Sequence, residues 1–384
     1  MPSAFTLLAW LPVALSLIGS LYMLAALVTF RRFFAAAVPA EPRTEGVTIL
    51  KPLYGGEPRL TDNLASFLEQ RHDGPIQLLC GVHRADDAAV AAVEALQARY
   101  PNARIDLIVD PTSHGANGKV ANLINLEPHI AHDIVALSDS DMVARPDYLA
   151  GLLDALDRPD TGVVTLAYHG RGDAGFWSRV AAAGLSWQFL PGVIFGTAHG
   201  LAKPCMGSTI AMRLTTLAAI GGFAAFADVL ADDYAIGEAV AAQGLQVVVP
   251  PMLVAHASAE PDFGALWRHE LRWGATIRDV VPLSYAMGVI AMPFSLALLA
   301  TPFLPLPGLA LAGFALAVRM AVAIAVDRQA GERTAPLWLL PLRDCLTFAV
   351  FIASLTVRSV DWRGAVLRME PEGRITAEPE IPAS

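Results

Sequence analysis

Hydrophobic positions at the start of the chain form one long uncharged run. It extends from Ala4 to Phe30, and Arg31 and Arg32 follow it directly. The run is long enough to cross a bilayer, which takes about 20 residues. A cleavable signal peptide would instead place its basic residues first and have a core of about 7–15 apolar residues. The pattern therefore predicts an uncleaved transmembrane helix. By the positive-inside rule, the two arginines place the next segment in the cytoplasm.

Three more apolar runs follow residue 282, at 283–306, 307–326 and 336–357. Prolines interrupt the first, which predicts an irregular segment that is re-entrant or interfacial. Charges within such runs are unfavourable in lipid unless they face protein or reach the headgroups from near a helix end. We expect Arg319 to reach the headgroups, and both interpretations stay open for the pair Arg343–Asp344.

Residues 32–281 lie between these ends, have ordinary polarity and are numerous enough to bury their own core. Short apolar runs alternate there with segments of helical periodicity, and the runs occupy 46–53, 76–82, 103–110, 133–137 and 161–168. This alternation is typical of a mostly parallel sheet covered by helices on both faces. The sequence therefore predicts an α/β fold anchored by membrane helices. The predicted segments are 1–31 (amino-terminal transmembrane helix), 32–281 (cytoplasmic domain), 282–358 (about three membrane segments) and 359–384 (polar tail).

Composition supports a membrane protein. Of the 384 residues, 54% are hydrophobic and only 16% are charged, whereas soluble proteins have about 25% charged residues. The formal net charge of −9 argues against a general nucleic-acid binder. The three cysteines are far apart in the sequence and have no CxxC spacing, so neither a disulfide framework nor a zinc site is predicted.

Acidic residues follow two of the predicted strands. Asp139 and Asp141 come after the run 133–137, and Asp86–Asp87 come after 76–82. In parallel sheets, ligands bind beyond the carboxyl ends of the strands. Two carboxylates one residue apart are suited to Mg²⁺, which proteins usually hold with one or two carboxylates plus substrate phosphates. Taken alone, Asp-x-Asp is a weak signal, because most instances are solvated turns; its position after a strand and the other acidic segment strengthen it.

Two other segments have both a structural and a functional interpretation. Asp232 and Asp233 precede an amphipathic helix, where they would cap it and complement its dipole or hold a carboxylate in place as a base. In the segment 267–279, arginines alternate with Trp267 and Trp273. That pattern predicts an interfacial amphipathic helix or a clamp for a diphosphate.

The small residues of 199–213 have two interpretations as well. Gly207, Ser208 and Thr209 lie between a predicted strand and helix. They would allow the backbone to approach a sugar or an acceptor, or they would serve tight internal packing. Both interpretations stay open.

In this order, these segments resemble a family-2-type glycosyltransferase domain. More closely, they resemble the ceramide glucosyltransferase family (glycosyltransferase family 21), which includes bacterial members that glycosylate hopanoid lipids. The resemblance covers nearly the whole chain, and the order and spacing are more specific than any single motif. It is carried by ILKPLYGGEPRLTDNLASFLEQ, LSDSDM, KPCMGSTIAMRLTTLAAIGGF, LADDYAIGEAV, RHELRW and VDWRGAVLRM.

The resemblance implies a GT-A-type nucleotide-sugar domain and assigns roles to individual residues. Asp139 and Asp141 match the metal motif, and Asp233 matches the catalytic base. Arg272 and Trp273 match the end of a (Gln/Arg)-x-x-Arg-Trp motif whose first position is His269 here, a departure that leaves either His269 or Arg268 in that role. The residues expected to contact the nucleotide-sugar are Lys51, Pro52, Asp86, Asp87, Lys119, Asp139 and Arg268.

The implied reaction transfers a sugar from a UDP-sugar, with inversion, to a hydroxyl of a membrane lipid of the ceramide or hopanoid type. A divalent cation, Mg²⁺ or Mn²⁺, would assist. The implied partners are the donor, the lipid acceptor and the bilayer, and no nucleic acid. A multi-pass protein of the bacterial inner membrane with a cytoplasmic catalytic domain is expected. Three other functions stay open: a polyprenyl-phosphate sugar transferase, a processive polysaccharide synthase, and a non-catalytic membrane scaffold that binds nucleotide-sugar.

Overall fold

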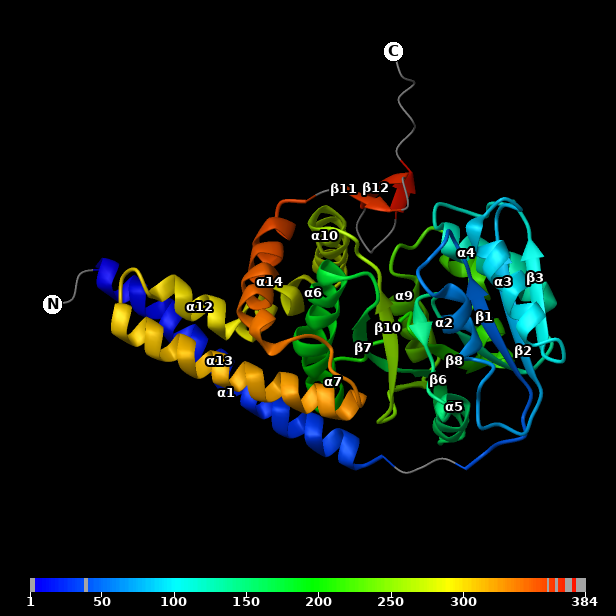
Figure 1. Ribbon diagram of the computed structural model, residues 1–384, viewed down its shortest axis with the longest axis horizontal. Helices are drawn as coiled ribbons and strands as arrows, with labels where there is room; N and C mark the ends of the chain where they lie inside the picture. The colour runs from blue at the N-terminus through cyan, green and yellow to red at the C-terminus, as the bar shows by residue number, and fades with distance from the viewer. Residues whose placement is uncertain (1–3, 38–40, 358, 363–364, 370–374, 378–384) are drawn as a thin grey trace, which may run out of the picture. The chain divides into compact units, whose positions relative to one another are not determined.

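The computed structural model describes residues 4–37, 41–357, 359–362, 365–369 and 375–377 (Figure 1). The chain divides into two compact units. The sheet unit comprises Ala36–Tyr168, Gly200–Ala259 and Gly373–Ser384. The helical unit comprises Met1–Ala35, His169–His199 and Glu260–Glu372.

A seven-stranded sheet forms the centre of the sheet unit, in the order β3-β2-β1-β4-β8-β6-β9. Four neighbouring pairs are parallel, and β8 is antiparallel to both of its neighbours. The prediction of a mostly parallel sheet is therefore confirmed. The strands are β1 (Val47–Pro52), β2 (Ile76–Val82), β3 (Arg104–Val109), β4 (Ile134–Leu137), β6 (Thr161–Thr165), β8 (Ile210–Arg213) and β9 (Gln246–Val248).

The central strands are buried along their whole length. All six residues of β1 and all four of β4 are buried, because helices cover the sheet and leave no face for alternating polar residues. The main hydrophobic core joins Leu50, Leu79 and Leu137 of the sheet to residues of α4 and α9. The helices of this unit are α2 (Leu60–Ala65), α3 (Ala88–Arg99), α4 (Gly118–Leu126), α5 (Tyr148–Leu156), α8 (Leu214–Ala219) and α9 (Asp232–Ala242), with short 3₁₀ turns η1 (Glu127–His129) and η3 (Phe223–Phe226).

A smaller antiparallel pairing joins β5 (Met142–Val143) to β10 (Leu253–Ser258). Because β5 begins directly after Asp141, this pairing attaches the acidic segment to a distant part of the chain. The run predicted at 161–168 ends as a strand at Thr165, and the chain then enters β7 (Ala167–Gly172).

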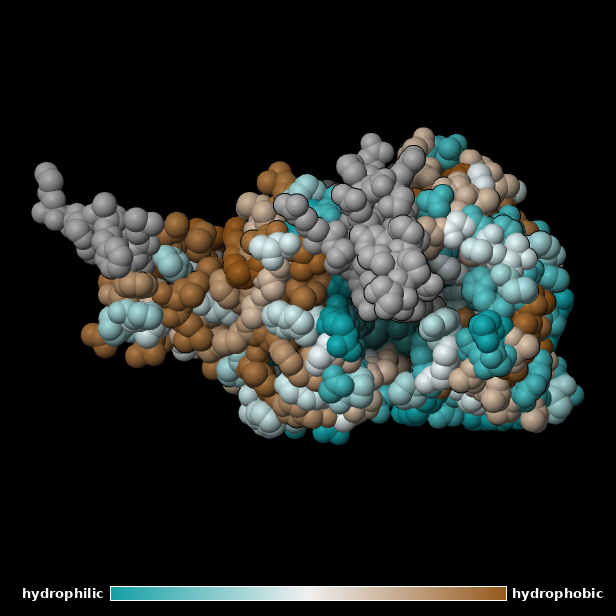
Figure 2. All heavy atoms as spheres, turned by 90° about the horizontal axis from the view of Figure 1, so that it is seen from above, coloured by the Kyte–Doolittle hydropathy of each residue, from teal (hydrophilic) through white to brown (hydrophobic). Residues whose placement is uncertain are grey.

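Three helices of the helical unit pack closely on one another: α1 (Ala4–Ala35), α12 (Pro293–Ala300) and α13 (Pro305–Ala330). Figure 2 shows hydrophobic side chains gathered over the end of the unit that these helices form. The other helical segments are α6 (Phe176–Gly184), the π-helical turn η2 (Leu185–Phe189), α7 (Leu190–Ala198), α10 (Phe263–Val280), α11 (Pro282–Met287), η4 (Gly288–Ala291), η5 (Leu337–Leu339) and α14 (Leu340–Ser354).

Four helices in the described part of the chain are long and apolar enough to cross a membrane. They are Trp10–Ala35, Phe176–Ala198, Pro305–Ala330 and Leu337–Ser354. The segments Pro282–Ala291 and Pro293–Ala300 meet at 68° and form either a broken span or a re-entrant loop. The irregularity predicted from the prolines is therefore present at this position.

The boundaries of the two units differ from the predicted domain boundaries. Residues 169–199 and 260–281 fall inside the predicted domain 32–281, yet they belong to the helical unit. The segment Phe176–Ala198 is long enough to span a bilayer, but Arg179, Gln188 and Pro191 interrupt its apolar pattern. Because of these polar and proline positions, the hydropathy pattern did not predict a membrane span here.

The prediction that Arg319 reaches the headgroups is wrong. Its side chain is fully buried, with Nη2 2.8 Å from Asp344 Oδ1. Its Nη1 donates to the carbonyl of Trp187 at 2.5 Å, within the π-helical turn η2, where main-chain carbonyls leave the α-helical pattern. A buried guanidinium needs both a counter-charge and acceptors for its protons, and α14 and η2 supply them.

The predicted polar tail contains β11 (Ser359–Trp362), which pairs antiparallel with β12 (Ala365–Met369), and a short strand β13 (Ile375–Ala377). Arg363 and Gly364, two residues of the segment that resembles the family's tail, lie outside the described residues.

Candidate active site

The segment Ser138–Met142 leaves β4 as a fixed turn. The amide of Ser138 donates to the carbonyl of Leu50 at 3.1 Å, and the amide of Asp139 donates to the carbonyl of Gly207 at 3.2 Å. The hydroxyl of Ser138 donates to the carbonyl of Ser208 at 2.8 Å. Main-chain contacts from two neighbouring segments therefore hold the acidic pair, and the interpretation as a solvated turn does not describe it.

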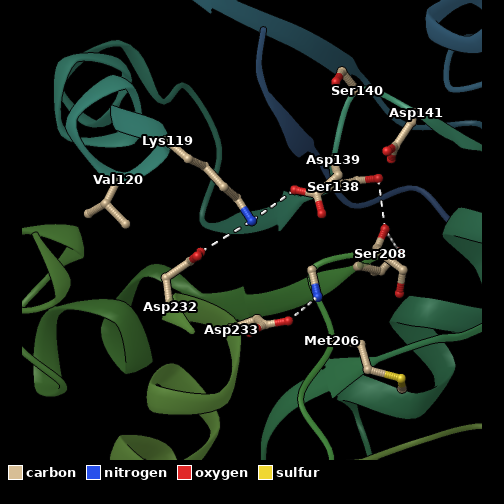
Figure 3. A network of polar contacts seen from close by, with 12 residues as sticks. Lys119, Val120, Ser138, Asp139, Ser140, Asp141, Met206, Ser208, Asp232 and Asp233 are labelled. Atoms are coloured by element: carbon tan, nitrogen blue, oxygen red, sulfur yellow. Dashed lines mark hydrogen bonds and ion pairs between the residues drawn. The ribbon is translucent and has the colours of Figure 1, made fainter. Parts of the chain in front are cut away.

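Lys119 lies between carboxylates from two parts of the chain (Figure 3). Its ammonium is 2.8 Å from Asp139 Oδ1 and 3.2 Å from Asp232 Oδ2. Asn117 caps α4 by accepting from the amides of Lys119 and Val120. This cap fixes the first turn of α4 and therefore the position of Lys119. Burial lowers the pKa of Lys119, but the surrounding carboxylates outweigh that effect and raise the pKa. The lysine therefore stays charged.

Asp233 is held by two main-chain amides. Gly207 donates to Oδ2 at 2.9 Å and Tyr234 donates to Oδ1 at 2.8 Å. Desolvation by the surrounding protein, with the charge of Asp232, raises the pKa of Asp233 to about 6, and Lys119 opposes the rise. A carboxylate fixed in direction, with a pKa close to neutral, has the properties of a general base.

The sequence predicted that Asp232 caps α9 or complements its dipole from the first turn; its place in the first turn is confirmed, whereas the capping is not observed. The cap position is Ala231, and no side chain caps α9. Asp232 lies inside the first turn and is only 7% exposed, next to Lys119. Its charge is compensated by an ammonium from a different helix, a contact that local sequence does not reveal.

His256 is a site residue that the sequence analysis missed. It lies on β10, is buried, and has Nε2 3.2 Å from Asp141 Oδ2. The pairing of His256 with Met142 and a bond from the amide of Ala257 to the carbonyl of Asp141, at 2.7 Å, place it there. Only this antiparallel pairing brings the histidine to the acidic pair, and no motif in its own segment predicts that.

The carboxylate oxygens of Asp139 and Asp141, and the imidazole beside them, are donor atoms of the kind that bind a divalent cation. Carboxylate oxygens suit Mg²⁺ and Mn²⁺, and imidazole is a common ligand for transition metals. The side chains of Asp139 and Asp141 are 32% and 31% exposed, so a substrate can reach them. Among the described residues, no three His, Cys, Asp or Glu side chains form a complete metal centre. Such a cation would therefore take further oxygen ligands from the substrate.

Lys51 lies beneath the acidic turn. Its side chain is fully buried, and Nζ donates to Ser138 Oγ at 3.0 Å and to the carbonyl of Asp139 at 2.9 Å. The ammonium also lies 3.4 Å from the ring centroid of Phe67. Burial lowers the pKa of Lys51 to about 7. In this structure Lys51 stabilises the acidic turn through these two hydrogen bonds, and a direct contact with nucleotide stays a prediction.

The other residues expected near the nucleotide lie at the ends of β1 and β2. Pro52 ends β1. Asp87 Oδ1 accepts from the amides of Ala89 and Gly55, at 2.8 and 2.9 Å, and so caps α3 and holds the preceding loop. Asp86 is exposed and pairs with Arg84 at 2.6 Å.

The remaining predicted residues lie on α10, in the helical unit. His269 Nδ1 is 2.5 Å from Glu260 Oε1, and its ring lies 4.6 Å from that of Trp273 in an edge contact. Arg268 is exposed, and Arg272 is partly buried. The structure therefore brings Lys51, Lys119 and Asp233 together with the acidic turn. Pro52, Asp86 and Asp87 lie near the ends of β1 and β2, and the remaining residues lie along α10.

The family can be assigned from the sequence as a whole. Residues 11–375 match glycosyl transferase family 21. The chain belongs to that family. The resemblance seen in the motifs is thereby confirmed.

Similar proteins agree with the assignment to family 21. Ceramide glucosyltransferase 1 of Caenorhabditis elegans is 26% identical over 225 residues, which are 55% of this chain and 45% of that protein. A ceramide glucosyltransferase of Komagataella phaffii is 29% identical over 149 residues, 36% of this chain and 29% of that one. The matches thus span less than half the length of these relatives.

A solved structure shares the fold. It is the mannosyltransferase PcManGT from Pyrobaculum calidifontis, in complex with GDP-Man and Mn²⁺. The two chains are 19% identical with a TM-score of 0.50, over 90% of this chain and 99% of the mannosyltransferase. The predicted GT-A-type fold with membrane-type helices at both ends is confirmed.

Gly207 provides a test of how closely this family 21 site is packed. A Cβ at this position would lie 2.6 Å from Asp139 Oδ2 and 3.2 Å from Lys119 Nζ, so the small residue serves internal packing against the acidic turn. We expect Gly207→Ala to displace the Asp139 carboxylate and lower kcat/KM by about 10²-fold, the loss typical of a misplacement of about 1 Å.

Gly118→Ala is the matched control. It lies next to Lys119, and a Cβ there would meet nothing within 4 Å. Steady-state kinetics and the thermal midpoint of both variants check the prediction. Equal activity of the two variants would show that the turn tolerates the displacement.

Proposed function

We propose that this protein transfers a sugar from a UDP-sugar to a hydroxyl group of a membrane lipid, with inversion at the anomeric carbon. The observation that carries the proposal is Asp233, a carboxylate with its pKa raised to about 6 and its direction fixed by the amide of Gly207. Membership of family 21 and relatives named ceramide glucosyltransferase support the choice of reaction.

The chemistry follows from the placement of the charges. Asp233 takes the proton of the acceptor hydroxyl, whose oxygen forms a bond to the anomeric carbon. On the opposite side of that carbon, the bond to the β-phosphate oxygen breaks, and UDP leaves with the electron pair. Asp139 and Asp141 are the residues that would hold a divalent cation, and His256 lies next to Asp141, with its Nε2 3.2 Å from Oδ2. When bound, such a cation supplies positive charge to the diphosphate.

Lys119 and Arg272 complete the proposed roles. Lys119 compensates part of the negative charge of Asp139 and Asp232, which reduces the repulsion between carboxylates that lie close together. By the family's motif, Arg272 assists the departing diphosphate, and Trp273 and His269 accompany it on the same helix.

The acceptor is proposed to be a lipid because the part of the chain that the structure describes includes four helices suited to a bilayer. The ceramide type follows the names of the relatives. The hopanoid type follows the alanine-rich and proline-rich composition, which is typical of bacterial proteins. On this proposal the sheet unit is cytoplasmic, where UDP-sugars are found, and the membrane is the bacterial inner membrane.

A transfer assay tests the proposed function. The purified protein in lipid vesicles is supplied with radiolabelled UDP-glucose or UDP-N-acetylglucosamine and with ceramide or a hopanoid alcohol, and the lipid extract is analysed by mass spectrometry. A labelled lipid that is stable to mild acid supports the proposal. An acid-labile product identifies a polyprenyl-phosphate transferase, and a polymer identifies a processive synthase. Donor binding without any product identifies a scaffold.

The pKa of Asp233 predicts the pH dependence. A base with a pKa of about 6 is protonated below that pH, so kcat/KM should fall as the pH drops through about 6. Asp232→Asn removes a neighbouring negative charge, which lowers the pKa of Asp233 and moves this acidic limb to lower pH by roughly one unit. Lys119→Met removes a positive charge and should move the limb to higher pH.

Measurement of kcat/KM between pH 4.5 and 8.5 for the wild-type protein, Asp232→Asn and Lys119→Met checks this prediction. Shifts of opposite sign in the two variants are expected. If the limb stays in place in both, another group titrates.

A further inference from the structure

One face of α10 is packed along α14 (Figure 1). Leu266, Glu270, Gly274 and Arg278 are four residues apart and so share a face of the helix. Leu266 and Gly274 are buried, and a Cβ on Gly274 would lie 3.2 Å from the Cβ of Ser354. The guanidinium of Arg278 donates to the carbonyl of Ser354. These contacts set the rotation of α10 about its own axis.

Arg343 of α14 makes the charged contact in this stripe. It is 3% exposed and forms a two-pronged ion pair with Glu270, with Nη2 2.7 Å from Oε2. It also donates to Thr347 Oγ1 from Nε and Nη2, at 3.0 and 2.9 Å, and to the carbonyl of Val180 of α6 at 3.4 Å. A Cβ on Gly184 would lie 2.9 Å from its Cζ. The guanidinium therefore has partners on three helices and no room beside it.

The helix geometry connects Glu270 to the family's motif. Two residues of an α-helix turn through about 200°, so Arg272 projects from nearly the opposite side of α10. The ring of Trp273 is also oriented by its edge contact with His269, and His269 is in turn hydrogen-bonded to Glu260. Whatever fixes the direction of Glu270 also fixes the direction of Arg272.

We propose that Arg343 is a positioning residue for the reaction: by holding Glu270 against α14, it sets the rotation of α10 and thereby aims Arg272. This inference rests on the proposed function, in which Arg272 assists the leaving diphosphate. Arg343 itself does not touch the substrate, and the sequence motif does not include it.

A neighbouring ion pair allows this role to be separated from general stabilisation. Asp344, the next residue of α14, pairs with Arg319 of α13 and is equally buried, at 3% exposure. Glu270→Gln and Asp344→Asn each replace the carboxylate partner of a buried arginine with an amide of nearly the same shape. Only the first change touches α10.

Kinetics of the purified protein in lipid vesicles test the proposal. For Glu270→Gln and Arg343→Met we expect kcat to fall on the order of 10²-fold, with KM for the lipid acceptor changed less than about threefold. Because the two residues act as one contact, the double variant should be no worse than the single ones. Arg343→Lys, which keeps the charge but not the planar fork, should be intermediate. Asp344→Asn should keep its kcat per folded molecule.

A readout without turnover separates this inference from the proposed function. Arg272→Cys in a Cys345→Ser background leaves the buried Cys80 and Cys205 as the other thiols. The rate of labelling of that cysteine by a charged thiosulfonate should change with Glu270→Gln and stay the same with Asp344→Asn. Equal effects of the two changes, on labelling or on kcat, would overturn the positioning role. If the wild-type protein transfers no sugar, the proposed function fails, and the labelling comparison still decides this inference.

Discussion

Replacing Asp233 with asparagine should reduce kcat by roughly 10²–10⁴-fold, the usual contribution of a general base. Asparagine preserves the shape and can still accept from the amide of Gly207, a bond of 2.9 Å in the structure. It has no capacity to take a proton at neutral pH. Donor affinity, measured by calorimetry with UDP, should stay within a few fold, because Asp233 is not assigned to the nucleotide.

Glu238→Gln is the matched control for this change. Glu238 lies on the same helix and is exposed, so the same loss of one carboxylate is made away from the site. We expect wild-type kcat for it. A purified Asp233→Asn protein with turnover near that of Glu238→Gln would remove Asp233 from its role as the base.

Changing the acidic pair should have the second-largest effect. In Asp139→Asn or Asp141→Asn, one charged oxygen ligand becomes a neutral amide, and we expect the activity at low metal concentration to fall by about 10²-fold. Chelation of divalent cations should abolish transfer by the wild-type protein, and added Mn²⁺ or Mg²⁺ should restore it. Titration of activity against metal concentration measures both effects.

His256 makes the metal prediction more specific. Its Nε2 is 3.2 Å from Asp141 Oδ2, so His256→Gln should raise the metal concentration needed for half-maximal activity by about 10–100-fold, whether it binds the cation or orients Asp141. His72→Gln is the control. His72 bonds the carbonyl of Glu45 at 2.8 Å, so the same change is made at a histidine that serves a different contact. Activity that is unaffected both by chelation and by His256→Gln would contradict a metal role for the acidic pair.

The sequence was sufficient to predict the acidic turn because the rule involved is local. An apolar strand followed by Asp139 and Asp141 places carboxylates at a known edge of a parallel sheet, and β4 ends at Leu137 as expected. Asp233 was assigned from a helix start combined with the family motif; the structure shows that two main-chain amides hold its carboxylate, and its role as the base stays a prediction. These predictions need only the order of strands and helices along the chain.

Contacts between distant segments could not be predicted in this way. His256 reaches Asp141 only through the pairing of β5 with β10, and Asp232 contacts Lys119 rather than capping its own helix. The partner of Arg319 is likewise set by packing between helices. Hydropathy alone also failed for Phe176–Ala198, because three interruptions weakened a pattern whose length still suits a membrane.

The pair formed by Arg319 and Asp344 has a consequence for how the protein is made. Arg319 leaves the ribosome 25 residues before Asp344, so during synthesis the arginine reaches the bilayer without its counter-charge. A lone arginine at the centre of an inserting helix is unfavourable by about 2.5–3.5 kcal/mol. Insertion of α13 and α14 together, as a helical hairpin, avoids that state. The order of synthesis therefore favours delayed release of α13 into lipid until α14 has emerged.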